Sequence, residues 1–174
     1  PTPNLHSVRV IQFVNANTGY ICGGNSVQGV GEMSKTTNGG NTWTALSLPS
    51  PVNALRITAM NFVNANTGWA ATEGGFCIRT INGGISWNLQ TLETNTNYKV
   101  VSIQMLDANT GYSMASSLYK TTNGGTNWVK TTNPYILAGN WYNFYLMNRD
   151  VIFLNGGSDG PTGKVARSVD GGNT

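Results

Sequence analysis

Residues 36–43 read Thr-Thr-Asn-Gly-Gly-Asn-Thr-Trp, and this stretch returns at regular intervals along the chain. Residues 80–87 read Thr-Ile-Asn-Gly-Gly-Ile-Ser-Trp, and residues 121–128 read Thr-Thr-Asn-Gly-Gly-Thr-Asn-Trp. A fourth copy, Ser-Val-Asp-Gly-Gly-Asn-Thr, occupies residues 168–174. Four copies spaced roughly forty residues apart indicate a chain built from one repeated structural unit.

Each position of the stretch has a physical reason that points to a turn between two β-strands. The side chain of Asn or Asp accepts hydrogen bonds from nearby backbone N–H groups and closes the turn locally. Two consecutive glycines permit positive φ angles without a Cβ clash. The tryptophan then begins the next strand, and we expect it to be a buried anchor.

The repeated stretch resembles the Asp box of the BNR family, whose pattern is Ser/Thr, any, Asp, any, Gly, any, Thr, Trp. Three copies carry Asn in place of Asp, which removes a charge and keeps an acceptor oxygen. The resemblance covers almost the whole chain. It implies a β-propeller in which each box is a structural turn on the outside of a blade, away from any active site. The residues expected to form the boxes are Thr36, Asn38, Gly40, Trp43, Thr80, Asn82, Gly84, Trp87, Thr121, Asn123, Gly125, Trp128, Ser168, Asp170 and Gly172.

A second landmark repeats in step with the box. It reads Phe-Val-Asn-Ala-Asn-Thr-Gly plus an aromatic residue at 13–20 and 62–69, returns in related form at 105–112, and is degenerate at 147–151. Between the landmarks, short strands are bounded by Gly, Asn and Pro, and no segment shows a helical period. The pattern predicts an all-β propeller built of four-stranded antiparallel blades.

The blades are expected at about residues 5–49, 52–92, 98–131 and 141–174. The fourth has no final strand, so three complete blades and one incomplete blade are predicted. Because an open propeller leaves strand edges unpaired, we expect the chain to be a fragment of a larger propeller. The alternative is that a neighbouring copy completes the edge in an oligomer or a filament.

The composition is poor in charge. Asp, Glu, Lys and Arg make up 10% of the 174 residues, and the net charge is +3. Lys and Arg do not cluster, so no nucleic-acid partner is expected, and no run of about 18 apolar residues predicts a membrane span. A low-charge surface rich in Asn and Thr suits a secreted or cell-surface protein, and the lack of Asn-x-Ser/Thr sequons favours a bacterial source.

The two cysteines, Cys22 and Cys77, lie in different repeats. They are either two buried free thiols or a disulfide, which would need Cα atoms within about 7 Å of each other. Together with His6, the single histidine, they do not make a zinc site. No metal and no cofactor are expected.

We letter the strands of a blade A to D in chain order. In a propeller the D-to-A and B-to-C connections share one face, the usual ligand face. The aromatic residues Tyr135, Trp141 and Tyr142 suggest binding there, because exposed rings stack on sugars or anchor protein partners; alternatively, they fill the interface between the third and fourth blades. Asp159 in the long loop of the fourth blade and Arg56, expected near the central channel, complete the candidate binding residues.

The BNR family includes sialidases and other glycoside hydrolases, and the repeats are also similar to photosystem II assembly-factor-like propellers. A glycosidase needs two facing carboxylates about 5 to 10 Å apart. Neither such a pair nor the arginine cluster of a sialidase is recognisable, so no catalytic residue is assigned. We expect a non-catalytic propeller that mediates protein–protein assembly or adhesion, with another protein or a second copy as partner. The alternatives are a fragment of a sialidase-like glycoside hydrolase and a carbohydrate-binding propeller with a glycan ligand.

Overall fold

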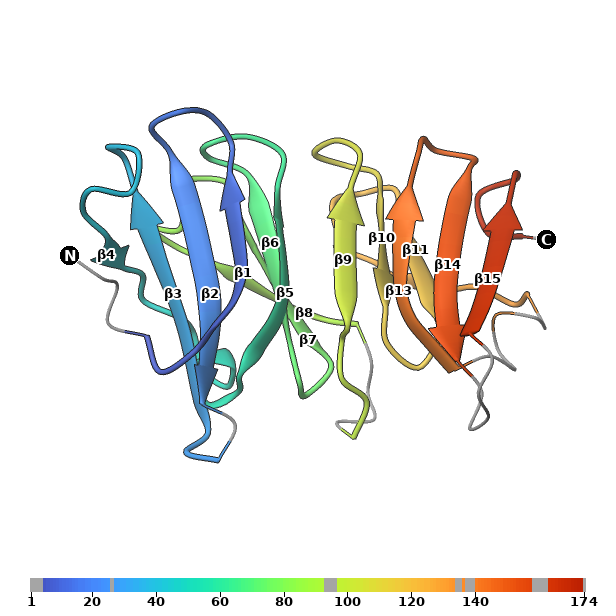
Figure 1. Cartoon of the computed structure of the whole chain (residues 1–174), viewed down its shortest axis with the longest axis horizontal. Coiled ribbons are helices and arrows are strands. Elements are labelled where there is room, and N and C mark those ends of the chain that lie inside the picture. The colour runs from blue at the N-terminus through green and yellow to red at the C-terminus, as the bar shows by residue number, and fades with distance from the viewer. Residues whose placement is uncertain are drawn as a thin grey trace.

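The computed structural model describes residues 5–25, 27–92, 97–133, 136, 140–157 and 163–173. These residues form four antiparallel sheets in which the strands follow one another in chain order (Figure 1). Within them, no helix has the length and apolar character needed to cross a membrane. The strands are β1 (Val8–Phe13), β2 (Gly19–Asn25), β3 (Val30–Thr36), β4 (Thr44–Ala45), β5 (Ile57–Phe62), β6 (Gly68–Thr72), β7 (Phe76–Thr80), β8 (Asn88–Thr91), β9 (Ser102–Met105), β10 (Gly111–Met114), β11 (Leu118–Thr121), β12 (Val129–Lys130), β13 (Asn140–Leu146), β14 (Ile152–Gly157) and β15 (Gly163–Ser168).

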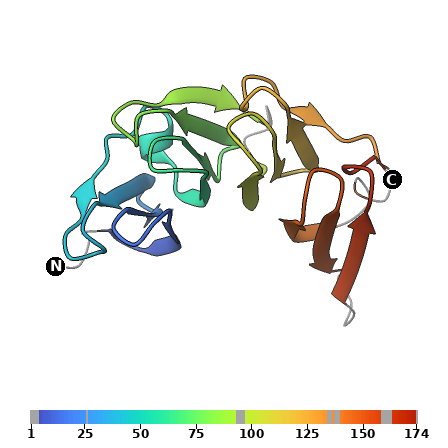
Figure 2. The ribbon, with the colours of Figure 1, turned by 90° about the horizontal axis from the view of Figure 1, so that it is seen from above.

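The four sheets stand side by side in an open arc, which Figure 2 shows from above. The A strands β1, β5, β9 and β13 line the concave side of the arc, and the short D strands β4, β8 and β12 lie on its outer side. The first three sheets have four strands and the last has three in the described part of the chain. This is the arrangement of propeller blades, so the predicted fold of three complete blades and one incomplete blade is confirmed. We call the sheets blades 1 to 4.

The turn between strands A and B of each blade is built on one Asn or Asp side chain. In blade 1 the Oδ1 atom of Asn15 accepts the backbone N–H groups two and three residues on, at 3.0 and 2.8 Å. Asn64 and Asp107 close the same turn in blades 2 and 3. Asn148 does so in blade 4, so the degenerate landmark of that blade keeps its turn-forming side chain.

Among the described residues, three hydrophobic clusters form the core, and each is shared by two consecutive blades. Tyr20 of blade 1 and Phe62 of blade 2 stack with ring centroids 3.6 Å apart and an interplanar angle of 8°. Trp69 of blade 2 and Tyr112 of blade 3 are fully buried against the blades that follow them. The arc is therefore stabilised by apolar burial between neighbouring blades rather than by one central core.

The prediction of buried tryptophan anchors is wrong in degree, because Trp43, Trp87 and Trp128 are only half-buried. Trp87 packs edge-on against Phe62 with ring centroids 6.3 Å apart, and Trp43 packs against Phe13 at 6.1 Å. The strand that follows each tryptophan is the outermost of its blade, so one side of the indole stays at the surface.

Cys22 and Cys77 are both buried free cysteines and belong to different core clusters. Of the two alternatives left open by the sequence, the structure has the free thiols. Burial raises the pKa of the Cys22 thiol to about 12, and it raises the pKa of Cys77 as well.

Candidate functional site

The four Asp boxes follow strand C of their blades and lead into strand D in blades 1 to 3, at the same ends of the blades as the A-to-B turns. In blade 1 the Thr36 hydroxyl accepts the N–H of Gly40 at 2.9 Å, and the Oδ1 atom of Asn38 accepts the N–H four residues on at 2.9 Å. Gly39 and Gly40 have φ angles of 69° and 90°. The N–H of Gly39 also donates to the carbonyl of Asn17 at 2.9 Å, which ties the box to the A-to-B turn.

The same contacts recur in the other boxes, where the N–H of Gly84, Gly125 and Gly172 donates to the hydroxyl that opens each box at 2.8 to 2.9 Å. Asp170 does in blade 4 what Asn does elsewhere, since its Oδ1 atom accepts the hydroxyl of Ser168 at 2.7 Å and a backbone N–H at 3.0 Å. The polar side chains of the boxes are engaged inside their own turns, which is a structural role.

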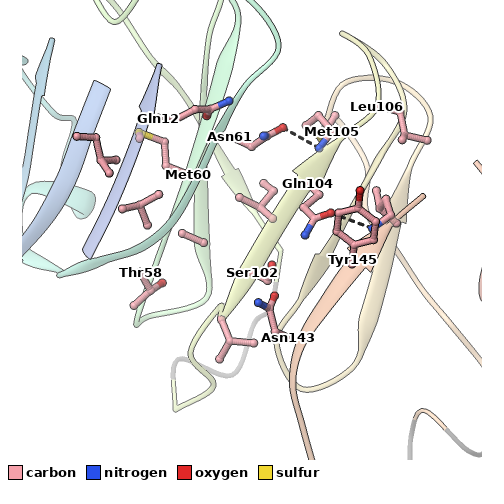
Figure 3. A pocket seen from close by; sticks show the side chains of 16 residues that line it. Gln12, Thr58, Met60, Asn61, Ser102, Gln104, Met105, Leu106, Asn143 and Tyr145 are labelled. Atoms are coloured by element: carbon pink, nitrogen blue, oxygen red, sulfur yellow. Dashed lines mark hydrogen bonds between the residues drawn. The ribbon is translucent and has the colours of Figure 1, made fainter. Parts of the chain in front are cut away.

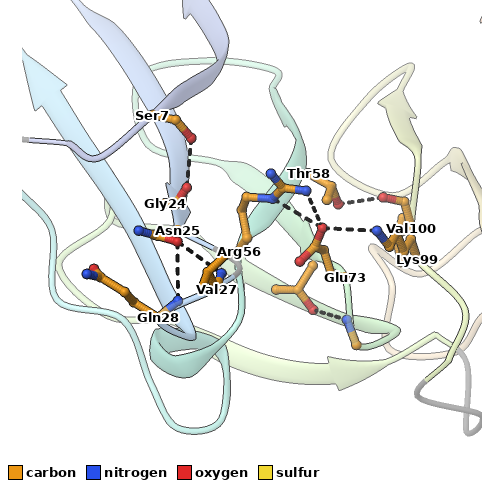
Figure 4. Close-up of polar contacts among 12 residues, drawn as sticks. Ser7, Gly24, Asn25, Val27, Gln28, Arg56, Thr58, Glu73, Lys99 and Val100 are labelled. Atoms are coloured by element: carbon orange, nitrogen blue, oxygen red, sulfur yellow. Dashed lines mark hydrogen bonds and ion pairs between the residues drawn. The ribbon is translucent and has the colours of Figure 1, made fainter.

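The ends of the blades opposite the Asp boxes form a surface that we call the loop face. A charged cluster lies there, made of Arg56, Glu73 and Lys99 (Figure 4). Arg56 directly precedes β5, Glu73 directly follows β6, and Lys99 lies shortly before β9. The Oε1 atom of Glu73 pairs with the Arg56 guanidinium, whose Nε lies at 3.1 Å, and with Lys99 Nζ at 3.3 Å. The side chains of Arg56 and Glu73 are 19% and 15% exposed, whereas that of Lys99 is 60% exposed.

Two opposing effects set the ionisation of Glu73. Burial of the carboxyl favours its protonated form, and the hydrogen bonds and charges of Arg56 and Lys99 favour its ionised form. The cations outweigh burial, so the pKa of Glu73 is lowered from its ordinary value of 4.5. At neutral pH the cluster therefore carries a net positive charge, and Lys99 is its solvent-facing member.

A hollow of about 460 Å³ adjoins the charged cluster on the loop face. Glu73 is one of its lining residues, and the 3₁₀ helix η1 (Val52–Ala54) contributes to its wall. A Cβ atom on Gly74 would lie 2.7 Å from Leu55 Cδ1, so this glycine keeps the hollow open. A largely apolar hollow beside a charged group can hold an apolar side chain of a ligand and orient a polar group next to it. The other lining residues are Pro51, Ala54, Leu55, Gly74 and Phe76.

The three candidate binding residues that the structure describes, Arg56, Trp141 and Tyr142, do not lie at one place. Arg56 belongs to the charged cluster. Trp141 packs against the core between blades 3 and 4, and its indole N–H donates to a backbone carbonyl at 3.1 Å, so it fits the interface-filling alternative. Tyr142, the next residue of β13, is 62% exposed. Tyr135 and Asp159 lie outside the described residues.

A second hollow, of about 480 Å³, runs along the concave wall of the arc (Figure 3). Amide side chains bridge neighbouring A strands there. Gln12 Nε2 donates to the Phe62 carbonyl at 2.8 Å, and Gln12 Oε1 accepts the Phe62 N–H at 2.7 Å. Asn61 accepts one N–H of β9 at 2.8 Å, and Gln104 makes two hydrogen bonds with β13 at 2.6 and 2.9 Å. The matching position of blade 4 holds Tyr145.

Sequence reasoning missed these bridges. Their signal in the sequence is an amide residue directly before the last residue of strand A in each of blades 1 to 3. It also missed the pairing of Arg56 with Glu73 and Lys99. Those three residues lie in connections that differ from blade to blade, so no repeated pattern marks them.

The carboxylates of the charged pairs in the described residues make structural contacts. Glu32 pairs with His6 at 2.8 Å, Glu73 belongs to the cluster above, and Asp107 lies 3.7 Å from Arg149. Backbone hydrogen bonds in its turn, with a smaller effect of Arg149, lower the pKa of Asp107. The pKa values of Glu73 and Asp107 thus move opposite to that of a general acid working near neutral pH, which needs a raised pKa.

Comparison with known proteins places the chain among propellers. The family model described as photosynthesis system II assembly factor YCF48 matches residues 3–173. The structure of YCF48 bound to D1 peptide is 20% identical to this chain and has a TM-score of 0.66. The alignment covers 91% of this chain and 54% of the YCF48 chain. YCF48 from Cyanidioschyzon merolae is 16% identical and has a TM-score of 0.67, and the alignment covers 97% of this chain and 52% of the YCF48 chain.

The GH74 enzyme of Niastella koreensis is 21% identical to this chain and has a TM-score of 0.71. The alignment covers 96% of this chain and 29% of the enzyme chain. At identities this low, likeness to the solved structures shows the fold alone. The chain spans about half the length of the YCF48 structures that it matches. Among curated proteins there is no significant match.

Proposed function

The chain belongs to the family of the photosynthesis system II assembly factor YCF48, and from this membership we propose that it is a non-catalytic propeller that binds a segment of another protein during assembly. The match of the family model to residues 3–173 carries this proposal. The YCF48 structure bound to D1 peptide supports the same class of partner here, a protein segment rather than a small-molecule substrate.

We propose the loop face as the binding site. Loops on a rigid scaffold are where binding residues concentrate, and this face carries both an exposed cation and an apolar hollow. Lys99 is 60% exposed and can pair with a carboxylate of the partner. The hollow beside Glu73 can take an apolar side chain. A segment with an acidic residue close to an apolar one fits both features.

The test is selection of displayed random peptides against the immobilised chain, followed by affinity measurements on two variants. Lys99→Glu reverses the exposed charge, and Leu55→Asp places a carboxylate in the hollow. Each should weaken the selected peptides at least about tenfold, which corresponds to roughly 1.4 kcal/mol. The control is Ile85→Asp, since Ile85 is 82% exposed in the blade 2 box and far from the loop face along its blade.

Circular dichroism of all three variants shows whether each remains folded. Peptides that bind the folded variants as tightly as the original chain would place the site elsewhere. Failure to select any peptide that prefers the original chain would count against a protein-binding role.

The glycoside hydrolase alternative has weaker support, because the GH74 likeness concerns the fold and both lowered carboxylate pKa values oppose acid catalysis. The glycan-binding alternative rests on exposed Tyr142. Hydrolysis of a xyloglucan or a sialoside by the purified protein would favour the first. Binding to a glycan array that is lost in Tyr142→Ala would favour the second.

A secreted or cell-surface location in a bacterium remains our proposal, and its support is the low charge and the lack of sequons in the sequence. Fractionation of the source cells tests it directly. Recovery of the protein only from the cytosolic fraction would contradict it.

A further inference from the structure

The carboxylate of Glu73 is engaged at one of its two oxygens. Its Oε1 atom accepts hydrogen bonds from Nε and Nη2 of Arg56 and pairs with Nζ of Lys99. None of the residues that the structure describes makes a hydrogen bond or an ion pair with the Oε2 atom. Figure 4 shows the contacts converging on one oxygen, with the second oxygen turned away from Lys99. One acceptor atom of this carboxylate is therefore left for a ligand.

The hollow beside Glu73 has apolar walls. Of the residues that line it in the described part of the chain, Glu73 alone has a side chain that can form a hydrogen bond. The walls are also held in place, because Val52 of η1 is fully buried and Phe76 packs against the core cluster of blades 1 and 2. The hollow is thus a preformed pocket with one side-chain acceptor, as ligand sites commonly are.

The charges around the hollow decide which donor suits this acceptor. The pKa of Glu73 is lowered, so the carboxylate is ionised at neutral pH and its oxygens only accept hydrogen bonds. Arg56 and Lys99 outnumber it, and Lys99 is 60% exposed. These two cations repel a lysine or an arginine that a partner brings close to them. A neutral donor carried on an apolar body avoids that repulsion.

Tyrosine and tryptophan are the side chains with this make-up. Each combines a large apolar ring with one O–H or N–H group. Leucine or phenylalanine would cover Oε2 without offering it a donor, and a covered acceptor without a partner costs binding free energy. Serine and threonine carry a donor and have little apolar surface to place against the walls.

We propose that the hollow is a specificity pocket for a tyrosine or a tryptophan of the partner segment, with the ring against the apolar walls and its O–H or N–H donating to Oε2 of Glu73. This inference rests on the proposed protein-binding function and adds the side chain that the loop face selects. An acidic residue near that ring in the partner would pair with the exposed Lys99, so the two features of the loop face recognise an aromatic donor beside a carboxylate.

Peptides that differ only in the donor test the inference. The tightest tyrosine-containing peptide from the display selection is prepared again with phenylalanine and with 4-aminophenylalanine, which keeps a donor on the ring. Titration calorimetry measures the three affinities. Loss of a hydrogen bond to a charged acceptor should weaken the phenylalanine peptide at least about tenfold. The 4-aminophenylalanine peptide should bind nearly as tightly as the tyrosine peptide. Where the selected residue is tryptophan, benzothienylalanine, which has sulfur in place of the indole N–H, replaces phenylalanine.

Two matched variants locate the contact on the protein. Glu73→Leu removes the acceptor, so it should bind the tyrosine and phenylalanine peptides equally. Glu32→Leu removes a carboxylate that pairs with His6 and does not line the hollow, so the tyrosine preference should change by less than about twofold. Circular dichroism shows whether both variants are folded. The comparison of the three peptides needs no variant and stays decisive if Glu73→Leu does not fold.

The outcomes separate this inference from the function on which it rests. Selected peptides that carry neither tyrosine nor tryptophan, or a phenylalanine peptide that binds as tightly as the tyrosine peptide, overturn the inference and leave the proposed function in place. A tyrosine preference that persists in folded Glu73→Leu also overturns it. Failure to select any binding peptide counts against the proposed function itself.

Discussion

The side-chain amide of Gln12 makes with Phe62 the pair of hydrogen bonds that one residue of a β-strand makes with its neighbour. It donates to the Phe62 carbonyl at 2.8 Å and accepts the Phe62 N–H at 2.7 Å. Strands β1 and β5 belong to different sheets, so this side chain replaces the missing ladder between two inner edges. Gln104 likewise donates one hydrogen bond to β13 and accepts one from it, and Asn61 accepts one N–H of β9.

Replacement of Gln12 by Met should destabilise the protein by about 1–3 kcal/mol, because it leaves the partly buried Phe62 N–H and carbonyl without their partner. Urea unfolding followed by tryptophan fluorescence measures the loss. Gln28→Met is the control, since Gln28 is exposed in a loop, and it should change stability by less than about 0.5 kcal/mol. Equal effects of the two substitutions would mean that the bridge contributes nothing measurable.

Replacement of Thr121 by Val should cost about 1–3 kcal/mol, because it keeps the shape of a fully buried side chain and removes the acceptor for the N–H of Gly125. Thr121→Ser keeps the hydroxyl, as Ser168 does in blade 4, and should retain most of the stability. Thermal unfolding of both variants gives the comparison. A serine variant as unstable as the valine variant would shift the explanation from the hydrogen bond to the lost methyl group.

Trp87→Ala should cost about 3 kcal/mol, and Trp43→Ala clearly less. Trp87 packs against the core cluster of blades 1 and 2, whereas Trp43 packs on Phe13, whose own surface is 42% exposed. Chemical denaturation of the two variants side by side measures the difference. Equal losses would contradict the idea that contact with the core cluster of blades 1 and 2 makes Trp87 the more costly residue to remove.

Acid should weaken the loop-face cluster. The folded-state pKa of Glu73 lies below its ordinary value of 4.5, so its ionised form contributes stability above that value, and the contribution is lost as the pH falls through the folded pKa. The melting temperature of the original chain should therefore fall more steeply below about pH 5 than that of Glu73→Gln. Parallel curves for the two proteins would falsify the assignment of the cluster as a stabilising ion pair.

Both cysteines should be inert to a disulfide reagent at pH 8 in the folded protein. The thiolate is the reactive form, and burial raises the pKa of Cys22 to about 12. After denaturation without reductant, both thiols should titrate. A count of zero thiols in denaturant would show that the protein in solution contains the disulfide after all.

The fold could be predicted from the sequence because its turns are local. The side chains of Asn15 and Asn38 find their partners within four residues, so the same short pattern marks every blade. The loop-face cluster could not be predicted in this way. Arg56 and Glu73 flank paired strands of blade 2, and Lys99 joins them only because blades 2 and 3 pack together. Nothing in the spacing of three unlike loops encodes that contact. The burial of the tryptophans was overestimated, because the sequence does not show that few side chains pack over the outermost strand of a blade.

The box turns also determine how readily this protein deamidates. Asn-Gly is the dipeptide in which asparagine most readily deamidates, because the unhindered glycine nitrogen attacks the side-chain carbonyl carbon and the side-chain nitrogen leaves as ammonia. In the boxes at Asn38, Asn82 and Asn123 that nitrogen is held by a hydrogen bond to the A-to-B turn, and the side-chain oxygen is held by a backbone N–H four residues on. Deamidation of these asparagines therefore proceeds only after unfolding. A molecule that stays folded keeps its asparagines, whereas one that stays unfolded accumulates aspartate and isoaspartate at the turns that must form again on refolding.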